Sequence, residues 1–160
     1  SMSEEEGGTA AAGNTAALAD NSIHIQGDVV EAAAYNLEIP DGFEVKSSED
    51  SLLLENKKGT IQFNIMDKTD VASDFESYVQ KTYDSAVASG MAEGEIEDAV
   101  IKNRSMKRFA MSMTQDGEQL DSYVYFARVN SRVIMITLTS KDGGLEDASA
   151  ADAFVAQIDF

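Results

Sequence analysis

Hydrophobic and polar positions alternate with a period of two along most of this chain, which is typical of strands that bury one face. The alternation predicts strands over residues 22–26, 35–39, 52–54, 61–65, 96–101, 109–113, 123–129 and 133–139. Short polar turns, at Asn56 to Gly59, Asp116-Gly117 and Asn130-Ser131, indicate antiparallel hairpins. We expect Ile61, Phe63 and Ile65 to face the core.

Two segments follow the period of a helix instead. Over 75–87, apolar and aromatic side chains recur at helical intervals, and Gly90 follows as a stop signal. Ser73 and Glu76 have the spacing of a capping box at the start of this helix. A shorter C-terminal helix is expected over 145–158, where it packs an apolar edge through Phe154, Val155 and Ile158.

The elements follow the order strands, helix, strands, helix, and each has one apolar face to bury. Helices packed on an antiparallel sheet satisfy that requirement, so we predict an α+β fold. Residues 23–160 are near the commonest size of one domain, and no internal repeat indicates a second core. We therefore expect a single domain over 23–160.

Residues 1–22, SMSEEEGGTAAAGNTAALADNS, differ from the rest in composition. They include four acidic and no basic residues and are poor in aromatic and branched side chains, so they bury too little surface to offset the entropy of ordering. We interpret them as a disordered acidic tether. Ser1 and Met2 resemble a cloning remnant on a truncated chain, which leaves room for a signal peptide and a lipidated cysteine upstream.

Charge and composition limit the partners of the domain. The formal charge of the chain is −17, and the four leader carboxylates leave −13 on residues 23–160. Such a surface repels nucleic acid and anionic lipid, so we expect no nucleic-acid partner and no membrane contact beyond a lipid tether. The mean hydropathy of −0.24 is too polar for a membrane span. The absence of cysteine fits an extracytoplasmic protein.

The segment 35–43, YNLEIPDGF, combines an aromatic residue, an extended apolar run, Pro, Gly and a second aromatic residue. Together with the order of elements, it resembles the opening of PsbP-like domains. This superfamily includes the photosystem II subunit PsbP, the Mog-type Ran-binding import factor and the bacterial envelope lipoprotein DcrB. The resemblance covers residues 23–160 and implies an antiparallel sheet of about six strands with helices on its faces, an α/β/α sandwich.

The resemblance also bears on function and location. It implies a binding or assembly module without a shared active site, and many bacterial relatives look like secreted or lipid-anchored proteins of unknown role. The chain departs from the common pattern at Phe43, where a tryptophan is frequent. No metal-binding or Ran-binding residue set can be matched, so the resemblance implies fold and extracytoplasmic location but no site residues.

One basic cluster stands out in the acidic chain, across the predicted turn after residue 101. With two tyrosines on one face of a later strand, it forms a candidate partner-binding surface. Its residues are Lys102, Arg104, Lys107, Arg108, Tyr123 and Tyr125. A positive patch on a negative body favours an anionic partner. In the alternative interpretation, the basic side chains balance the charges of Glu95, Glu97 or Asp98.

The remaining candidates favour structural roles. His24 is the only histidine, and the alternation places it on the polar face of a strand. Phe109, Met111 and Met113 are expected beneath a helix, as core. Carboxylates cluster in three groups without the spacing of a calcium loop: Glu93, Glu95, Glu97 and Asp98; Asp67, Asp70 and Asp74; and Asp142, Glu146 and Asp147.

No catalytic, cofactor-binding or metal-binding residue is predicted, and no cofactor is expected. The sequence favours a non-enzymatic, extracytoplasmic bacterial domain that is tethered to the membrane and binds a protein or a cell-envelope component. Two alternatives are a small glycan hydrolase that uses paired carboxylates and a calcium-stabilised structural module.

Overall fold

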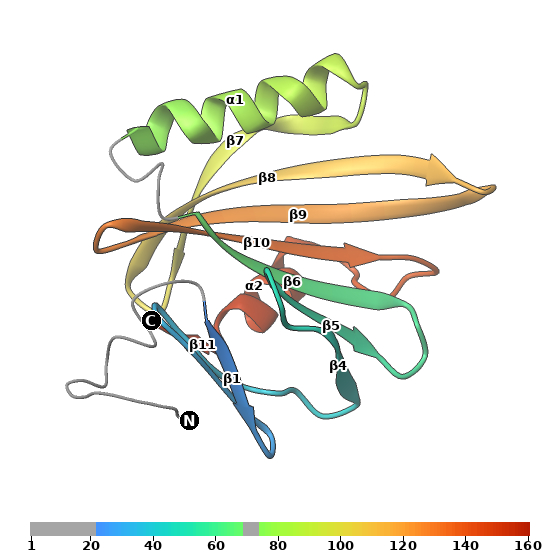
Figure 1. The fold of residues 1–160 in the computed structure, drawn as a ribbon. Helices are drawn as coiled ribbons and strands as arrows, with labels where there is room; N and C mark the ends of the chain where they lie inside the picture. The colour runs from blue at the N-terminus through green and yellow to red at the C-terminus, as the bar shows by residue number, and fades with distance from the viewer. Residues whose placement is uncertain (1–21, 69–73) are drawn as a thin grey trace.

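The chain folds into two antiparallel sheets and two helices in the computed structural model, which describes residues 22–68 and 74–160 (Figure 1). The larger sheet has seven strands in the order β4-β5-β6-β10-β9-β8-β7, and the smaller has four in the order β1-β2-β3-β11. The larger sheet contains β4 (Phe43–Ser47), β5 (Leu52–Asn56), β6 (Ile61–Lys68), β7 (Ala92–Ile101), β8 (Arg104–Gln115), β9 (Glu118–Val129) and β10 (Arg132–Ser140). The smaller contains β1 (Ile23–Gln26), β2 (Val29–Ala32), β3 (Asn36–Glu38) and β11 (Ile158–Asp159). The fold is thus α+β and mostly β.

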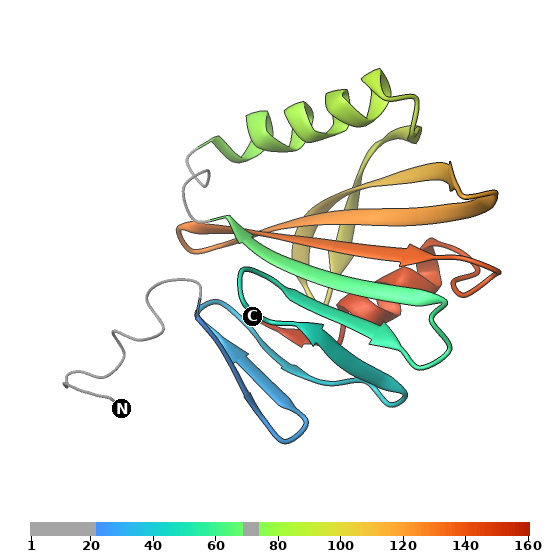
Figure 2. The same ribbon diagram turned by 45° about the vertical axis from the view of Figure 1, so that its right-hand side comes forward.

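The two faces of the seven-stranded sheet are covered by different elements (Figure 2). Helix α1 (Phe75–Ala88) packs on one face, which we call the outer face, and its Tyr78 and Tyr83 rings contact Phe126 and Phe109. Helix α2 (Ala148–Val155) and the four-stranded sheet cover the inner face. The larger core lies on that inner side, where residues of β5, β6, β9 and β10 pack against α2 and β11.

The alternation located most of the sheet correctly. Every strand that it predicts overlaps a strand of the structure, and Ile61, Phe63 and Ile65 are buried as expected. The hairpin around Gly59 is confirmed by the pairing of Leu54 with Phe63. Gly90 has a φ of +74° directly after the end of α1, the left-handed conformation that glycine adopts without steric cost.

The division into two sheets corrects the expectation of about six strands in one sheet. The chain reverses between β1 and β2, and β2 then pairs with β3, so residues 23–38 form a sheet of their own. Helix α2 ends at Val155 instead of reaching Ile158. Ile158 pairs with Leu37 in the smaller sheet, where both side chains are buried, because an extended backbone supplies β3 with its second neighbour.

The expectations for Met113, for the cap of the first helix and for the tether have different outcomes. Met113 is exposed and not core, because it lies beyond the part of β8 that packs under α1, whereas Phe109 is buried and Met111 half-buried. The N-cap of α1 is Asp74, whose side chain makes no capping bond. Ser73 of the expected capping box and the tether expected over residues 1–22, apart from Ser22, lie outside the described residues.

Within residues 22–68 and 74–160, no helix has the length and apolar character needed to cross a membrane.

Candidate functional site

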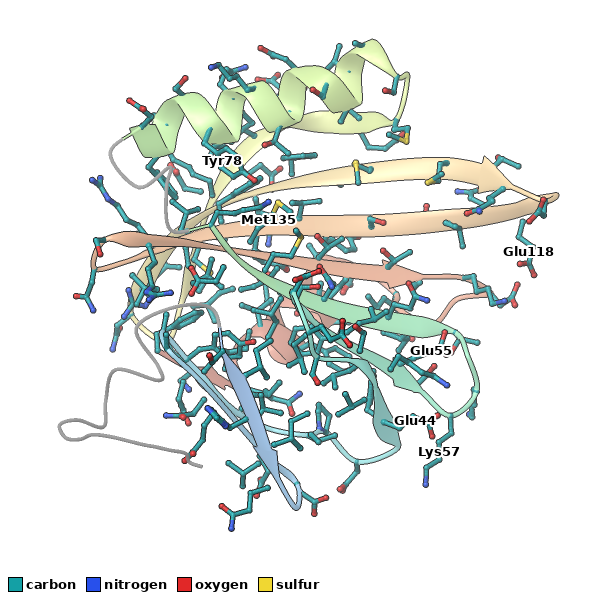
Figure 3. All side chains as sticks on the ribbon, viewed as in Figure 1. Glu44, Glu55, Lys57, Tyr78, Glu118 and Met135 are labelled. Atoms are coloured by element: carbon teal, nitrogen blue, oxygen red, sulfur yellow. The ribbon has the colours of Figure 1, made fainter. Side chains whose placement is uncertain are left out.

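A polar pocket of about 230 Å³ opens at one end of the seven-stranded sheet, between the β5–β6 turn, the β8–β9 turn and the end of β10. We call it the hairpin pocket. Figure 3 shows Glu55 and Glu118 at this end of the molecule. The lining includes three carboxylates, two amides, one amine and three hydroxyls, which belong to Glu55, Asp116, Glu118, Gln62, Gln115, Lys141, Thr60, Thr139 and Ser140. Leu120 adds one apolar side chain.

Strand order and register bring these side chains together. Glu55 lies opposite Gln62 between β5 and β6, and Gln62 lies opposite Thr139 between β6 and β10. Opposed residues of antiparallel strands point to the same face, so these three side chains form a row across the outer face. The turn between β8 and β9 adds Asp116 and Glu118 at the same end.

Hydrogen bonds fix the β5–β6 turn that forms one wall. The Asn56 side chain accepts from the backbone N–H groups of Thr60 and Ile61, at 2.8 and 3.0 Å, and donates to the Thr60 hydroxyl at 2.8 Å. The backbone N–H of Lys141 donates to the carbonyl oxygen of Thr60 at 3.0 Å. A Cβ atom on Gly144 would lie 2.7 Å from that same oxygen, so the close approach requires glycine. The wall is therefore held before any ligand arrives.

The charges of the pocket are partly neutralised. Gln62 Nε2 donates to Glu55 Oε2 at 3.3 Å, and Lys46 Nζ lies 3.7 Å from Glu55 Oε1. Lys141 Nζ lies 3.5 Å from Glu118 Oε1. Carboxylates and amides that share a rigid wall can bind adjacent hydroxyl groups of one ligand through several hydrogen bonds. The chemistry of the pocket therefore suits a polyhydroxylated molecule.

The structure separates the six residues of the predicted partner-binding surface. Lys102 lies in the β7–β8 turn and Arg104 begins β8. Lys107 lies on the outer side of β8, and Arg108 lies on the inner side. Tyr123 and Tyr125 share the inner face of β9, where Tyr123 is half-buried and Tyr125 fully buried. The six residues therefore do not form one continuous surface.

Charge balance accounts for two members of the cluster. Lys107 Nζ lies 2.5 Å from Asp98 Oδ1, and Arg108 Nη2 lies 2.7 Å from Glu97 Oε1. These contacts confirm the alternative interpretation for both cations. An exposed pair of this kind contributes under about 1 kcal/mol.

Arg108 and Tyr125 also join the sheet to α2. Arg108 Nη1 and the Tyr125 hydroxyl both donate to Asp152 Oδ1, at 2.8 and 2.5 Å, and the guanidinium lies 5.8 Å from the centre of the Tyr125 ring. Burial and the hydrogen bond to Asp152 raise the pKa of Tyr125 above its ordinary value. Replacing either side chain would disturb the packing of α2, so neither is a good reporter of partner binding.

The other candidates remain solvated or scattered. His24 is exposed and lies opposite Glu31 in the β1–β2 hairpin, on the polar face as expected. Among the described residues, no group of three or more His, Asp or Glu side chains is arranged to hold a metal ion. Asp70, one of the predicted carboxylates, lies outside that part of the chain.

None of the pocket carboxylates is among the site residues that the sequence predicts. The two turns that carry them are visible as Asn56 to Gly59 and Asp116-Gly117, but their proximity depends on the contact of β10 with both β6 and β9. β6 and β10 are separated by α1 and three strands in the sequence, and no local pattern encodes their pairing.

Comparison with solved structures shows what the fold resembles. A protein from Bacteroides thetaiotaomicron matches 87% of this chain at 16% identity with a TM-score of 0.60, and this chain spans 48% of that protein's length. PA94, a protein of unknown function from Pseudomonas aeruginosa, matches 86% of this chain at 16% identity with a TM-score of 0.50, over 95% of its own length.

LpqN, involved in cell envelope biogenesis of Mycobacterium tuberculosis, matches 78% of this chain at 12% identity with a TM-score of 0.45, over 82% of its own length. No family model matches the chain, and no curated protein does. At these identities the first two similarities show a shared fold and leave function to the chemistry of the site.

Proposed function

We propose that this chain is a non-catalytic binding domain that works outside the cytoplasm and holds a glycan of the cell envelope in the hairpin pocket. The composition of the chain and the resemblance to envelope members of the PsbP-like superfamily support the location. The pocket supports the ligand class.

One observation carries the proposal: hydrogen-bonding side chains from five strands and turns converge on a pocket whose wall is already rigid. A sugar presents many hydroxyl groups and little apolar surface, which matches a lining with a single leucine. The volume of about 230 Å³ is below the roughly 300–1,000 Å³ of sites for drug-sized ligands, so the pocket suits about one sugar unit of a chain.

The pocket carboxylates are also the candidates for the acid and base of the glycan hydrolase alternative. A glycosidase needs two carboxyl groups roughly 5–10 Å apart across the scissile bond, and one of them must hold a proton in surroundings that disfavour its charge. Asp116 and Glu118 are exposed to solvent, and Lys141 lies beside Glu118. Neither carboxylate is shielded from water as the acid of a glycosidase is, which supports binding over catalysis.

The test is a titration with di-N-acetylchitobiose and with other uncharged disaccharides, followed by backbone amide shifts in NMR spectra. We expect shifts at residues of the β5–β6 and β8–β9 turns. Glu55→Gln keeps the shape of the side chain and removes its charge, so affinity should fall about tenfold. Glu44→Gln is the matched control, because Glu44 lies opposite Glu55 on β4 but does not line the pocket.

The outcomes separate binding from catalysis. Saturable shifts support the proposal if the affinity they report falls in Glu55→Gln but not in Glu44→Gln. Release of monosaccharide, followed by chromatography, would establish the hydrolase alternative instead. If none of the saccharides shifts the two turns, the proposed function is wrong.

A further inference from the structure

A second cavity, of about 160 Å³, lies at the opposite end of β8 from the hairpin pocket, between the β7–β8 turn and the C-terminal strand β11. We call it the C-terminal pocket. Four side chains that line it are apolar and at most 7% exposed: Ile101, Met106, Val155 and Ile158. Lys102 and Arg104 line it as well, together with Asp159 and Phe160. Apolar side chains and two cations thus surround one small cavity.

The backbone at Lys102 is in an unusual conformation. Lys102 has a φ of +51° and Asn103 a φ of +65°, so both turn residues are left-handed. The other positive-φ residues that are not glycine within the described part of the chain are Asn or Asp, which tolerate this region. A lysine there is strained, because a side chain with a Cβ atom disfavours the left-handed region. This strained residue places its cation at the pocket, which points to a use for the side chain.

Both cations have capacity for another anion. Lys102 Nζ lies 2.9 Å from Asp159 Oδ1, but half of the lysine side chain and 73% of the aspartate side chain are exposed, so this pair is weak and exchangeable. The Arg104 guanidinium lies 5.0 Å from the centre of the Phe160 ring and donates through Nη1 to the Arg128 carbonyl oxygen. No carboxylate among the described residues forms an ion pair with Arg104. A guanidinium has five N–H donors, so most of them stay available.

We propose that the C-terminal pocket binds a carboxylate attached to a short aliphatic chain. The carboxylate lies between Lys102 and Arg104, and the chain lies against Ile101, Met106 and Ile158. At about 30 Å³ for each water-sized group, a cavity of 160 Å³ holds about five such groups. That size suits a fatty acid of about six carbons or an apolar residue at the carboxyl end of a peptide. This site is separate from the hairpin pocket and does not depend on the proposed glycan.

Hexanoate is the probe, and two comparison compounds test its alkyl chain and its carboxylate separately. Hexylammonium keeps the chain and reverses the charge, whereas acetate keeps the carboxylate and removes the chain. We expect hexanoate to shift backbone amides over 101–106 and 155–160 in NMR spectra, and both comparison compounds to bind at least tenfold more weakly. N-acetyl-leucine tests the peptide source of the same chemistry, and the tighter of the two carboxylates identifies the source.

The variants separate binding from folding. Lys102→Gly removes the cation and relieves the left-handed strain, so the protein should remain folded while hexanoate binds about tenfold more weakly. Arg104→Gln should weaken binding by a similar factor. Lys58→Ala is the control, since Lys58 is an exposed lysine in the β5–β6 turn at the other end of the sheet. Hexylammonium binding as tightly as hexanoate, or hexanoate binding that Lys102→Gly and Arg104→Gln leave unchanged, would overturn the proposal.

Discussion

Replacing Asp152 by alanine removes the acceptor that joins α2 to the sheet, and its cost can be worked out from two contacts. Asp152 Oδ1 receives the Tyr125 hydroxyl at 2.5 Å and Arg108 Nη1 at 2.8 Å. Tyr125 is fully buried, so its hydroxyl would lose its partner without gaining water, which costs about 1–3 kcal/mol. The lost Arg108 contact adds about 0.5–1 kcal/mol, because the Asp152 side chain is 37% exposed.

The expected loss for Asp152→Ala is therefore about 1.5–4 kcal/mol in the free energy of unfolding. Tyr125→Phe should cost less, about 0.5–1.5 kcal/mol, because Asp152 then keeps Arg108 as its donor and no buried group is left unpaired. Asp159→Ala is the matched control. It also removes a carboxylate paired with a cation, but that pair is exposed, and the loss should stay within about 0.5 kcal/mol.

Urea unfolding followed by circular dichroism measures all three variants. The slope with urea should not change, because the substitutions remove contacts without altering the surface exposed on unfolding. The order of the losses is the informative result. A loss below about 1 kcal/mol for Asp152→Ala, or an equal loss for Tyr125→Phe, would refute the argument that a stranded buried hydroxyl dominates the cost.

Three further predictions concern two loop positions and one half-buried acid. Gly144→Ala would place a Cβ atom 2.7 Å from the Thr60 carbonyl oxygen, so it should cost about 1–3 kcal/mol in urea unfolding and weaken saccharide binding in the same NMR titration. Asp147→Ala removes the side chain that caps α2 and should cost about 1 kcal/mol, whereas Asp147→Ser should restore most of it. Burial raises the pKa of Asp67, and Arg132 opposes this effect. Protonation of Asp67 therefore stabilises the folded protein fully below the unfolded pKa of about 3.9, and this stabilisation is lost as pH rises through the folded pKa. The free energy of unfolding of Asp67→Asn minus that of the unsubstituted protein should therefore be more positive at pH 7.5 than at pH 4. The opposite trend in urea unfolding would contradict this sign.

The strands and hairpin turns could be predicted because their signals are local. Ile61, Phe63 and Ile65 alternate with polar residues, and one buried face is enough to determine where such a strand lies. The segments that were misjudged have weak local signals. Ile158 follows apolar residues at helical spacing, yet it joins a strand because Leu37, more than a hundred residues earlier, needs a neighbour.

The candidate sites were predicted less well than the fold. The basic residues after position 101 are close together in the sequence, but successive residues of a strand point to opposite faces, so Lys107 and Arg108 lie on opposite sides of the sheet. Lys102 and Arg104 stay together because both lie at the end of the hairpin, and they line the C-terminal pocket. Glu55 and Glu118 carry no sequence signal that distinguishes them from the other acidic residues.

The sequence by itself determined the mostly extended character of the chain, the turns that divide it, the first helix and the acidic surface. These properties depend on residues within a few positions of one another, where backbone geometry and side-chain period act directly. Only the tertiary structure decided the division into two sheets, the hydrogen bonds that join Asp152 to the sheet, and both pockets. Each of these needs β6 beside β10 or the C-terminal segment beside β3, and such distant contacts form only because they bury apolar surface that no local element covers.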